Sequence, residues 1–419
     1  MFGSAATFAT QLLIARALEP QLYGKFATEL LIINFIATLS GGATSTFLLH
    51  AHSKEGAGAK RWMRGATFYL ATVQGLGIIF LLIIASIREG SLAMKIAAIV
   101  LIPHMIGQSV LDLTVTENQM SYKHFNVAFW QFFPPVIRLA VVGAITYLQP
   151  TKEQSLLIVS AAFSATGLTI LFAGWKSVNQ LFRGKDTFPQ TRDSEEQKFY
   201  SGTTPTFRKA VESILPFGIG GILYLITIQG NLLLTAFLMS STTAGIFNAA
   251  LTISTALQQI PLILYQKYLL PKFHLLAHTD PGGLSEIHKK GARILLILGT
   301  IISLITCWLT PSFVSIFLGE AYQDSVPALQ ILCLSLPFRY MIAGTSSIIL
   351  AIDINVKVRV LALVALINFS LLLPLICILG ITGAAIATVL SDAIAFALFY
   401  RKAKNMAWVI PLLDRGCQK

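Results

Sequence analysis

The chain has 419 residues, of which 55% are hydrophobic and only 12% are charged, and its mean hydropathy is +0.71. A soluble domain carries about twice that charged fraction, so this composition excludes a soluble globular protein and predicts an all-α polytopic membrane protein. The formal net charge of +12 does not indicate a nucleic-acid partner, because the basic residues lie in short loops between apolar segments.

Apolar runs long enough to cross a bilayer recur along the whole chain. We predict about twelve transmembrane helices in two six-helix lobes. The first six span about residues 1–18, 27–49, 65–87, 91–113, 125–148 and 154–175, and the second six span about 211–238, 243–265, 291–310, 326–351, 359–379 and 381–400. The predicted organisation is an N-terminal lobe over 1–175, a cytoplasmic linker over 176–210, a C-terminal lobe over 211–400 and a cytoplasmic tail over 401–419.

A short pattern near the start of the chain recurs in its second half. Residues 18–31, LEPQLYGKFATELL, and residues 239–252, MSSTTAGIFNAALT, share a Gly-x-Phe within a polar break between two apolar runs. Gly24 therefore corresponds to Gly245, and Phe26 corresponds to Phe247. We interpret the pattern as an internal repeat that relates the two lobes, as in many transporters.

The placement of lysine and arginine predicts the orientation in the membrane. Of the 31 basic residues, 24 fall in the C-terminal tail and the loops of one predicted side, and five fall on the other side. Because cytoplasmic loops are enriched in Lys and Arg, both termini are expected in the cytoplasm. We expect no cleavable signal peptide after Met1, and the short first span leaves open an upstream start of the protein.

The two remaining arginines lie inside predicted spans. Arg138 falls in span 125–148, on the same helical face as Gln131, and Arg339 falls in span 326–351. A guanidinium near the middle of a bilayer costs several kcal/mol unless it faces water or a partner. We expect both arginines to line a wet cavity and to bind an anionic substrate, since Arg pairs bidentately with phosphate. The alternative is a structural arginine that caps a carbonyl or pairs with a carboxylate.

Titratable side chains in two other spans are candidates for a proton or ion path. His104, Gln108 and Asp112 form a polar stripe along one side of a helix at i, i+4 and i+8. The alternatives are a merely hydrogen-bonded histidine and an aspartate at the cytoplasmic edge. Asp392 in the last span is a similar candidate, which alternatively pairs with an arginine or lies near the inner interface.

Corresponding spans of the two lobes carry matching polar faces. Their members are Asn34 and Thr38 in the first lobe and Asn248, Thr255 and Gln259 in the second. These side chains would offer donors and acceptors to sugar hydroxyls. Hydrogen bonding between helices would explain the same pattern.

Motifs of known enzyme classes are missing from the sequence. It contains no P-loop, no HExxH, no GxSxG and no spaced set of Cys and His residues. The predicted outward loops are also too short to hold a donor and an acceptor for glycan polymerisation. We therefore expect a protein that is not an enzyme, with no catalytic residues, no metal, no cofactor and no ATP-driven step of its own.

Three segments carry a resemblance to a known family. Residues 12–27, LLIARALEPQLYGKFA, resemble the opening of the polysaccharide-transport flippases of the multidrug/oligosaccharidyl-lipid/polysaccharide superfamily. In that family an Ala-Arg-x-Leu run leads through a proline to Tyr-Gly-x-Phe. Residues 313–338 look like the family's segment before its tenth span, and residues 379–394 resemble the start of its twelfth. The first motif is matched here by Ala15, Arg16, Leu18, Pro20, Tyr23, Gly24 and Phe26.

The resemblance implies an O-antigen (Wzx-like) flippase of the bacterial inner membrane, built as two lobes around a cationic cavity. It implies an undecaprenyl-pyrophosphate-linked oligosaccharide as substrate, with membrane lipids and the polysaccharide polymerase machinery as partners. The alternative within transport is an ion-coupled multidrug-type exporter of the same superfamily. The alternative from another class is a membrane glycan polymerase.

Overall fold

The computed structural model describes residues 2–87, 92–148, 151–183, 204–263, 281–352 and 354–406, and nearly all of them are helical. No strand occurs within these ranges, so the all-α prediction is confirmed. Most of the predicted linker (184–203), most of the predicted tail (407–419) and the basic segment 264–280 lie outside the described residues.

The first part of the chain forms helices that follow one another with short breaks. They are α1 (Phe2–Ala37), a π-helical turn η1 (Thr38–Gly42), α2 (Ala43–Glu55), a 3-10 segment η2 (Gly56–Trp62), α3 (Met63–Ile87), α4 (Leu92–Val100), α5 (Ile102–Met120), α6 (His124–Leu148) and α7 (Lys152–Arg183). The second part contains α8 (Phe207–Leu238), α9 (Ser241–Ile263), α11 (Pro281–Phe313), η4 (Val314–Leu318), η5 (Glu320–Tyr322), α12 (Ser325–Cys333), α13 (Leu336–Ile352) and α14 (Ile354–Met406).

Eight of the described helical stretches are long and apolar enough to cross a membrane, or nine if the bent pair α12–α13 forms one span. Two of the eight have 52 and 48 residues, more than twice the about 20 that one span needs. Each contains a residue with positive φ, Glu19 (58°) or Gly380 (62°). These breaks fall between predicted spans one and two and between spans eleven and twelve. The chain is a multi-pass membrane protein.

The break in α1 reverses the direction of the chain. Glu19 has φ 58° and ψ 167°, and the following Pro20 lacks the N–H that a continuing helix would use. Tyr23 Oη lies 3.4 Å from Gln11 Oε1, although twelve residues of straight helix would span about 18 Å. The polar segment that the sequence analysis singled out is therefore a tight turn between two helices.

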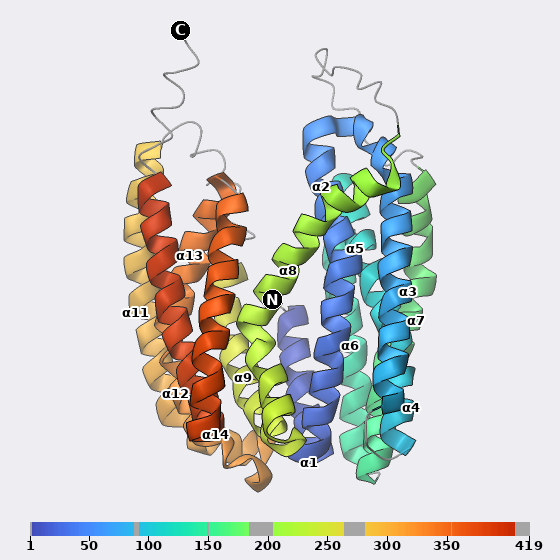
Figure 1. The fold of residues 1–419 in the computed structure, drawn as a ribbon. Coiled ribbons are helices and arrows are strands. Elements are labelled where there is room, and N and C mark those ends of the chain that lie inside the picture. Colours follow the sequence, from blue (N-terminus) through green and yellow to red (C-terminus); the bar gives the residue numbers. More distant parts are fainter. Residues whose placement is uncertain are drawn as a thin grey trace. The chain divides into compact units, whose positions relative to one another are not determined.

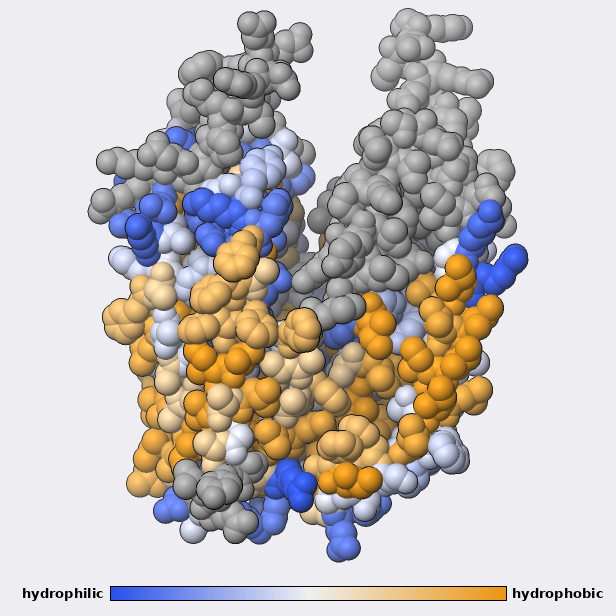
Figure 2. Space-filling model, turned by 180° about the vertical axis from the view of Figure 1, so that it is seen from behind, coloured by the Kyte–Doolittle hydropathy of each residue, from blue (hydrophilic) through white to orange (hydrophobic). Residues whose placement is uncertain are grey.

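The structure contains two compact units. One comprises Gly3–Lys25 together with the chain from Ile226 onward, and the other comprises Phe26–Leu225. Helices α1 and α8 each contribute residues to both units. On the face drawn in Figure 2, the coloured hydrophobic side chains lie mostly between hydrophilic ones, as expected for helices that cross a bilayer.

The unit Phe26–Leu225 is built around α5, which packs against α6 and α7 (Figure 1). An apolar cluster in this unit joins α2, α3, α5, α7 and the start of α8, and includes Phe47, Trp62 and Tyr69. The rings of Phe47 and Trp62 meet edge to face with centroids 5.1 Å apart. This cluster fixes the helices that carry the polar groups described below.

In the other unit, α13 packs against α11 and α14, and α12 packs against α9. The turn in α1 lies directly on α9. A Cβ on Gly24 would overlap the carbonyl oxygen of Ser241 and lie 2.7 Å from the backbone nitrogen of Gly245, and a Cβ on Gly245 would overlap the carbonyl oxygen of Pro20. The two glycines that correspond in the internal repeat therefore touch each other through their backbones.

Candidate functional site

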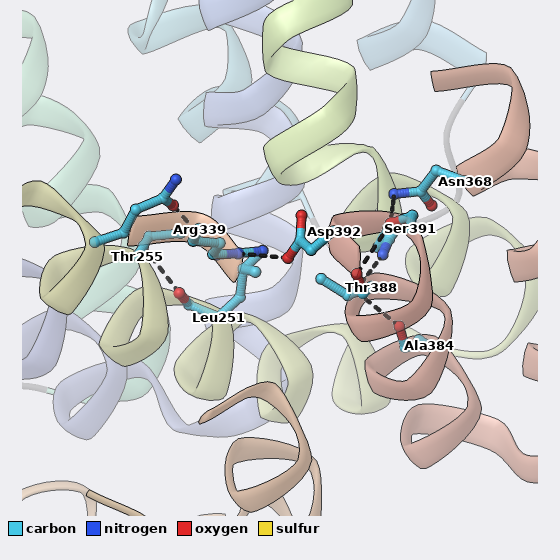
Figure 3. A network of polar contacts seen from close by, with 10 residues as sticks. Leu251, Thr255, Arg339, Asn368, Ala384, Thr388, Ser391 and Asp392 are labelled. Atoms are coloured by element: carbon cyan, nitrogen blue, oxygen red, sulfur yellow. Dashed lines mark hydrogen bonds and ion pairs between the residues drawn. The ribbon is translucent and has the colours of Figure 1, made fainter. Parts of the chain in front are cut away.

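A buried ion pair lies in the unit that contains the C-terminal helices. Arg339 Nε in α13 donates to Asp392 Oδ2 in α14 at 2.7 Å, and Arg339 Nη1 lies 3.3 Å from the Gln258 Oε1 acceptor in α9 (Figure 3). Only 2% of Arg339 and 6% of Asp392 are exposed. Of the alternatives stated for Asp392, the structure therefore shows the pair with an arginine, and the guanidinium charge is compensated.

Further hydrogen bonds extend from this pair along α14. Asn368 Nδ2 donates to Ser391 Oγ at 3.2 Å, and Asn231 Nδ2 in α8 donates to Thr388 Oγ1 at 2.6 Å. These side chains are buried, and Figure 3 shows most of them in one layer. The layer joins α8, α9, α13 and α14 through polar contacts that the sequence analysis had not assigned.

Two of the predicted glycan-binding residues on α9 have other surroundings. Thr255 Oγ1 donates to the Leu251 carbonyl of its own helix at 2.8 Å (Figure 3). Gln259 lines an apolar pocket of about 480 Å³ between α1, α9, α11 and α12, with Phe8 and Phe313 among the other walls.

The intramembrane arginine of the other unit is held differently. Arg138 Nε in α6 donates to Thr166 Oγ1 in α7 at 3.1 Å, and its Nη2 lies 3.4 Å from His104 Nδ1 in α5. The guanidinium carbon is 4.7 Å from the centroid of the Phe163 ring, a cation–π contact. Among the residues that the structure describes, no carboxylate forms an ion pair with Arg138. Within this described part of the chain, a ring face and neutral groups surround its positive charge.

A polar pocket of about 380 Å³ lies in the same unit. Asp112 and Gln108 line it from α5, and the Gln108 side chain is hydrogen-bonded to Asp112. Asn34 and Thr38 line it from the end of α1 and the π-helical turn. The pocket thus joins residues that the sequence analysis assigned separately to ion transfer and to glycan binding. The remaining walls are Ala37, Gly42, Ser45, Thr46 and Leu225.

The structure divides the stripe predicted along α5. Gln108 and Asp112 face the polar pocket, whereas His104 is buried against Arg138 and meets the Phe163 ring edge to face at 5.2 Å. The i, i+4, i+8 spacing was compatible with one continuous path. Instead, Gln108 and Asp112 line the pocket together with residues of α2, whereas His104 packs against Phe163 of α7.

Sequence reasoning missed a buried polar cluster beside the pocket. Ser40 Oγ, in the π-helical turn, lies 3.0 Å from Ser109 Oγ, and Gln74 Nε2 in α3 donates to both hydroxyl oxygens. Gln74 Oε1 is buried and has no hydrogen-bond partner among the described residues. A glutamine inside an otherwise apolar span was the signal that could have revealed this cluster.

Comparison with known proteins gives matches at the level of structure. The chain has 13% identity and a TM-score of 0.69 to the lipid II flippase MurJ in an inward closed conformation, covering 98% of this chain and 90% of that one. It has 12% identity and a TM-score of 0.61 to an inward-facing MATE-family multidrug resistance transporter of the MOP superfamily, covering 98% and 96%. A eukaryotic MATE transporter matches with 13% identity and a TM-score of 0.54. No protein-family model and no curated sequence matches the chain.

The chain shares its fold with these membrane proteins. The matched structures are a flippase and multidrug transporters rather than enzymes, and each match extends over nearly the whole chain. Polar and charged groups buried within membrane spans are costly, so they are the candidate functional groups of the chain. Within the described residues these are the polar pocket, the surroundings of Arg138 and the Arg339–Asp392 layer.

Proposed function

We propose that the protein is a flippase that moves an undecaprenyl-pyrophosphate-linked oligosaccharide, an O-antigen repeat unit or a related precursor, across the bacterial inner membrane. Transport would occur by alternating access of the predicted lobes 1–175 and 211–400, with both termini in the cytoplasm. The observation that carries the proposal is Arg138, a cation within a membrane span that no described carboxylate compensates. A fold shared with a lipid II flippase supports it.

In this proposal the side chains divide the substrate between them. Arg138 attracts the pyrophosphate, since a guanidinium binds phosphate oxygens bidentately. Asn34 and Thr38 contact the glycan, and Asn248 and Gln259 are further candidates in the second lobe. Arg339 contributes only after its pair with Asp392 opens, because that charge is otherwise compensated.

The second candidate function is an ion-coupled multidrug-type exporter. The observation in its favour is the 480 Å³ apolar pocket, whose walls include Phe8, Leu257 and Phe313. Pockets of this size lined by apolar side chains suit drug-sized ligands. His104, Asp112 and Asp392 would then be the groups through which an ion is coupled. A membrane glycan polymerase is the less favoured third candidate.

The distinguishing experiment uses a strain of the source bacterium that lacks the gene. Accessibility to an impermeant glycosidase or oxidant is measured while the membrane is intact and gives the leaflet on which the lipid-linked intermediates lie. The intermediates are then extracted and identified. Complete repeat units that accumulate on the inner leaflet, and move outward when the gene is restored, establish the flippase. Unpolymerised units on the outer leaflet establish the polymerase instead. An unchanged distribution together with increased drug sensitivity establishes the exporter.

A further inference from the structure

The hydrogen-bond pattern of the polar pocket limits what it can bind. Ser45 Oγ and Thr46 Oγ1 both donate to the Gly42 carbonyl, at 3.0 and 2.8 Å, so their hydrogens are used within the helix. What these hydroxyls can offer beyond the helix is oxygen lone pairs. Asp112 adds a carboxyl group, to which the Gln108 side chain is hydrogen-bonded. None of the lining residues that the structure describes is basic.

The volume of the pocket favours an organic ligand. At about 30 Å³ per water molecule, 380 Å³ corresponds to roughly a dozen waters. Pockets for small organic ligands begin at about 300 Å³, whereas a single ion needs only its first shell of oxygens. A ring with several hydroxyl groups fits both the size and the chemistry of the walls.

We propose that this pocket is a sugar subsite that accepts a neutral or amino sugar and rejects acidic sugars. An ammonium, amide or hydroxyl group of the sugar supplies donors to the oxygens of Asp112, Ser45 and Thr46, while Asn34 and Thr38 offer both donors and acceptors. The carboxylate of an acidic sugar would face Asp112, and like charges brought together in a pocket oppose binding. The inference rests on the proposed function only in assigning the sugar to a lipid-linked glycan.

The walls around the pocket are held in place before any ligand binds. The π-helical turn that begins at Thr38 follows the end of α1, which carries Asn34, and π turns within helices occur frequently at functional sites. Behind the turn, the buried contacts among Ser40, Ser109 and Gln74 fix η1 to α3 and α5. Such support lets the binding groups keep their geometry, which lowers the cost of ordering them on binding.

The test measures sugar binding to the full chain in lipid nanodiscs. Ligand-observed NMR gives dissociation constants for glucosamine, N-acetylglucosamine and glucuronic acid, and sodium chloride is titrated alone as a fourth probe. We expect the order glucosamine, N-acetylglucosamine, glucuronic acid from tightest to weakest. Asp112→Asn keeps the shape of the side chain. It should weaken the binding of glucosamine about tenfold, the effect of one lost charge contact. It should also raise the affinity for glucuronic acid to that for N-acetylglucosamine.

Two controls keep the result decisive. Glu117→Gln removes a carboxylate from the same helix outside the pocket walls, and it should leave all three affinities unchanged. Thr46→Val removes an oxygen from the pocket wall and should weaken the binding of the neutral sugar. It serves as a second test if Asp112→Asn lowers the amount of folded protein. Equal affinity for the three sugars, or an order that Asp112→Asn leaves intact, overturns the inference. Asp112-dependent stabilisation by sodium with no sugar binding overturns it as well.

Failure of this subsite is distinguishable from failure of the proposed function. The leaflet experiment reports outward movement of lipid-linked units whatever sugars they contain. A strain in which the restored gene moves these units, combined with the absence of Asp112-dependent sugar binding, removes the subsite and leaves the flippase.

Discussion

Arg339 and Asp392 lie 53 positions apart in the sequence and bond at 2.7 Å in the interior of one compact unit. Both groups have lost nearly all contact with solvent. In its place, each has the opposite charge of the other. Breaking such a pair leaves an uncompensated charge in a low-dielectric interior. The two residues therefore act together in holding α13 to α14.

The first prediction concerns this pair. Arg339→Ala should destabilise the protein by about 3–5 kcal/mol, because Asp392 is left buried without its partner. Thermal unfolding in detergent and the amount of protein in the membrane measure the effect. The double variant Arg339→Met with Asp392→Leu should regain most of the loss. Arg208→Ala, which breaks an exposed pair with Glu212, should change stability by no more than about 0.5 kcal/mol. Wild-type stability of Arg339→Ala would contradict the account.

The second prediction concerns the crossing of Gly24 and Gly245. Gly24→Ala and Gly245→Ala should each greatly reduce the folded amount, because a Cβ at either position overlaps backbone atoms that cannot rotate away. Gly75→Ala is the matched control in α3, since nothing lies within 4 Å of its Cβ position. That substitution should be neutral, or stabilising by up to about 1 kcal/mol. Yields in the membrane and melting temperatures compare the three variants.

The third prediction separates the two intramembrane arginines. Arg138→Gln should fold, since its removal leaves neutral partners rather than a buried opposite charge. It should nevertheless reduce outward movement of the lipid-linked substrate at least about tenfold, the effect of losing one charged contact. Arg138→Lys should restore only part of the activity, because an ammonium lacks the planar fork that pairs with phosphate. The assay is flipping in reconstituted vesicles. Full activity of Arg138→Gln at normal protein levels would exclude the phosphate role.

The fourth prediction concerns a hydroxyl outside the membrane-spanning helices. Tyr322 Oη in η5 donates to the Ala15 carbonyl at 2.7 Å, and burial raises the pKa of Tyr322 well above its usual value. The contribution of the neutral phenol is therefore fully present below the unfolded pKa of about 10 and is lost as the pH rises above it. Tyr322→Phe should cost about 1–3 kcal/mol at neutral pH. Above pH 10, the variant should also lose less stability than the wild-type protein does.

Unfolding measured from neutral pH to about pH 11 checks both parts of this prediction. Tyr122→Phe, at an exposed tyrosine, is the control and should change neither value. If Tyr322→Phe unfolds at the wild-type temperature throughout, the hydroxyl contributes nothing to stability.

The sequence predicted most helix positions because the length of an apolar run determines where a span lies. The predicted spans 65–87 and 125–148 agree with α3 and α6 to within two residues at each end. The breaks at Glu19 and Gly380 also fall where the predicted spans separate. Polar residues, proline and glycine between two apolar runs mark such breaks in the sequence itself.

The contacts between helices could not be predicted in the same way. The repeat places Asn34 and Thr38 opposite Thr255 and Gln259, and all four were expected on one kind of polar face. The first two line a polar pocket, whereas Thr255 bonds its own helix and Gln259 lines an apolar pocket. Equal spacing along a helix fixes which residues share a face. It does not fix which neighbouring helix that face meets.

The turn at Glu19 has a consequence for how the protein is made. The ribosome completes Gly3–Lys25 before it makes Phe26–Leu225, yet Gly3–Lys25 belongs to the compact unit that otherwise begins at Ile226. At about 5–20 residues per second, roughly 10–40 seconds of synthesis separate this helix from the first of its packing partners. During that interval the insertion machinery or surrounding lipid must cover a face that the finished unit buries. A helix made before all of Phe26–Leu225 thus reaches its final neighbours only after that whole unit has been synthesised.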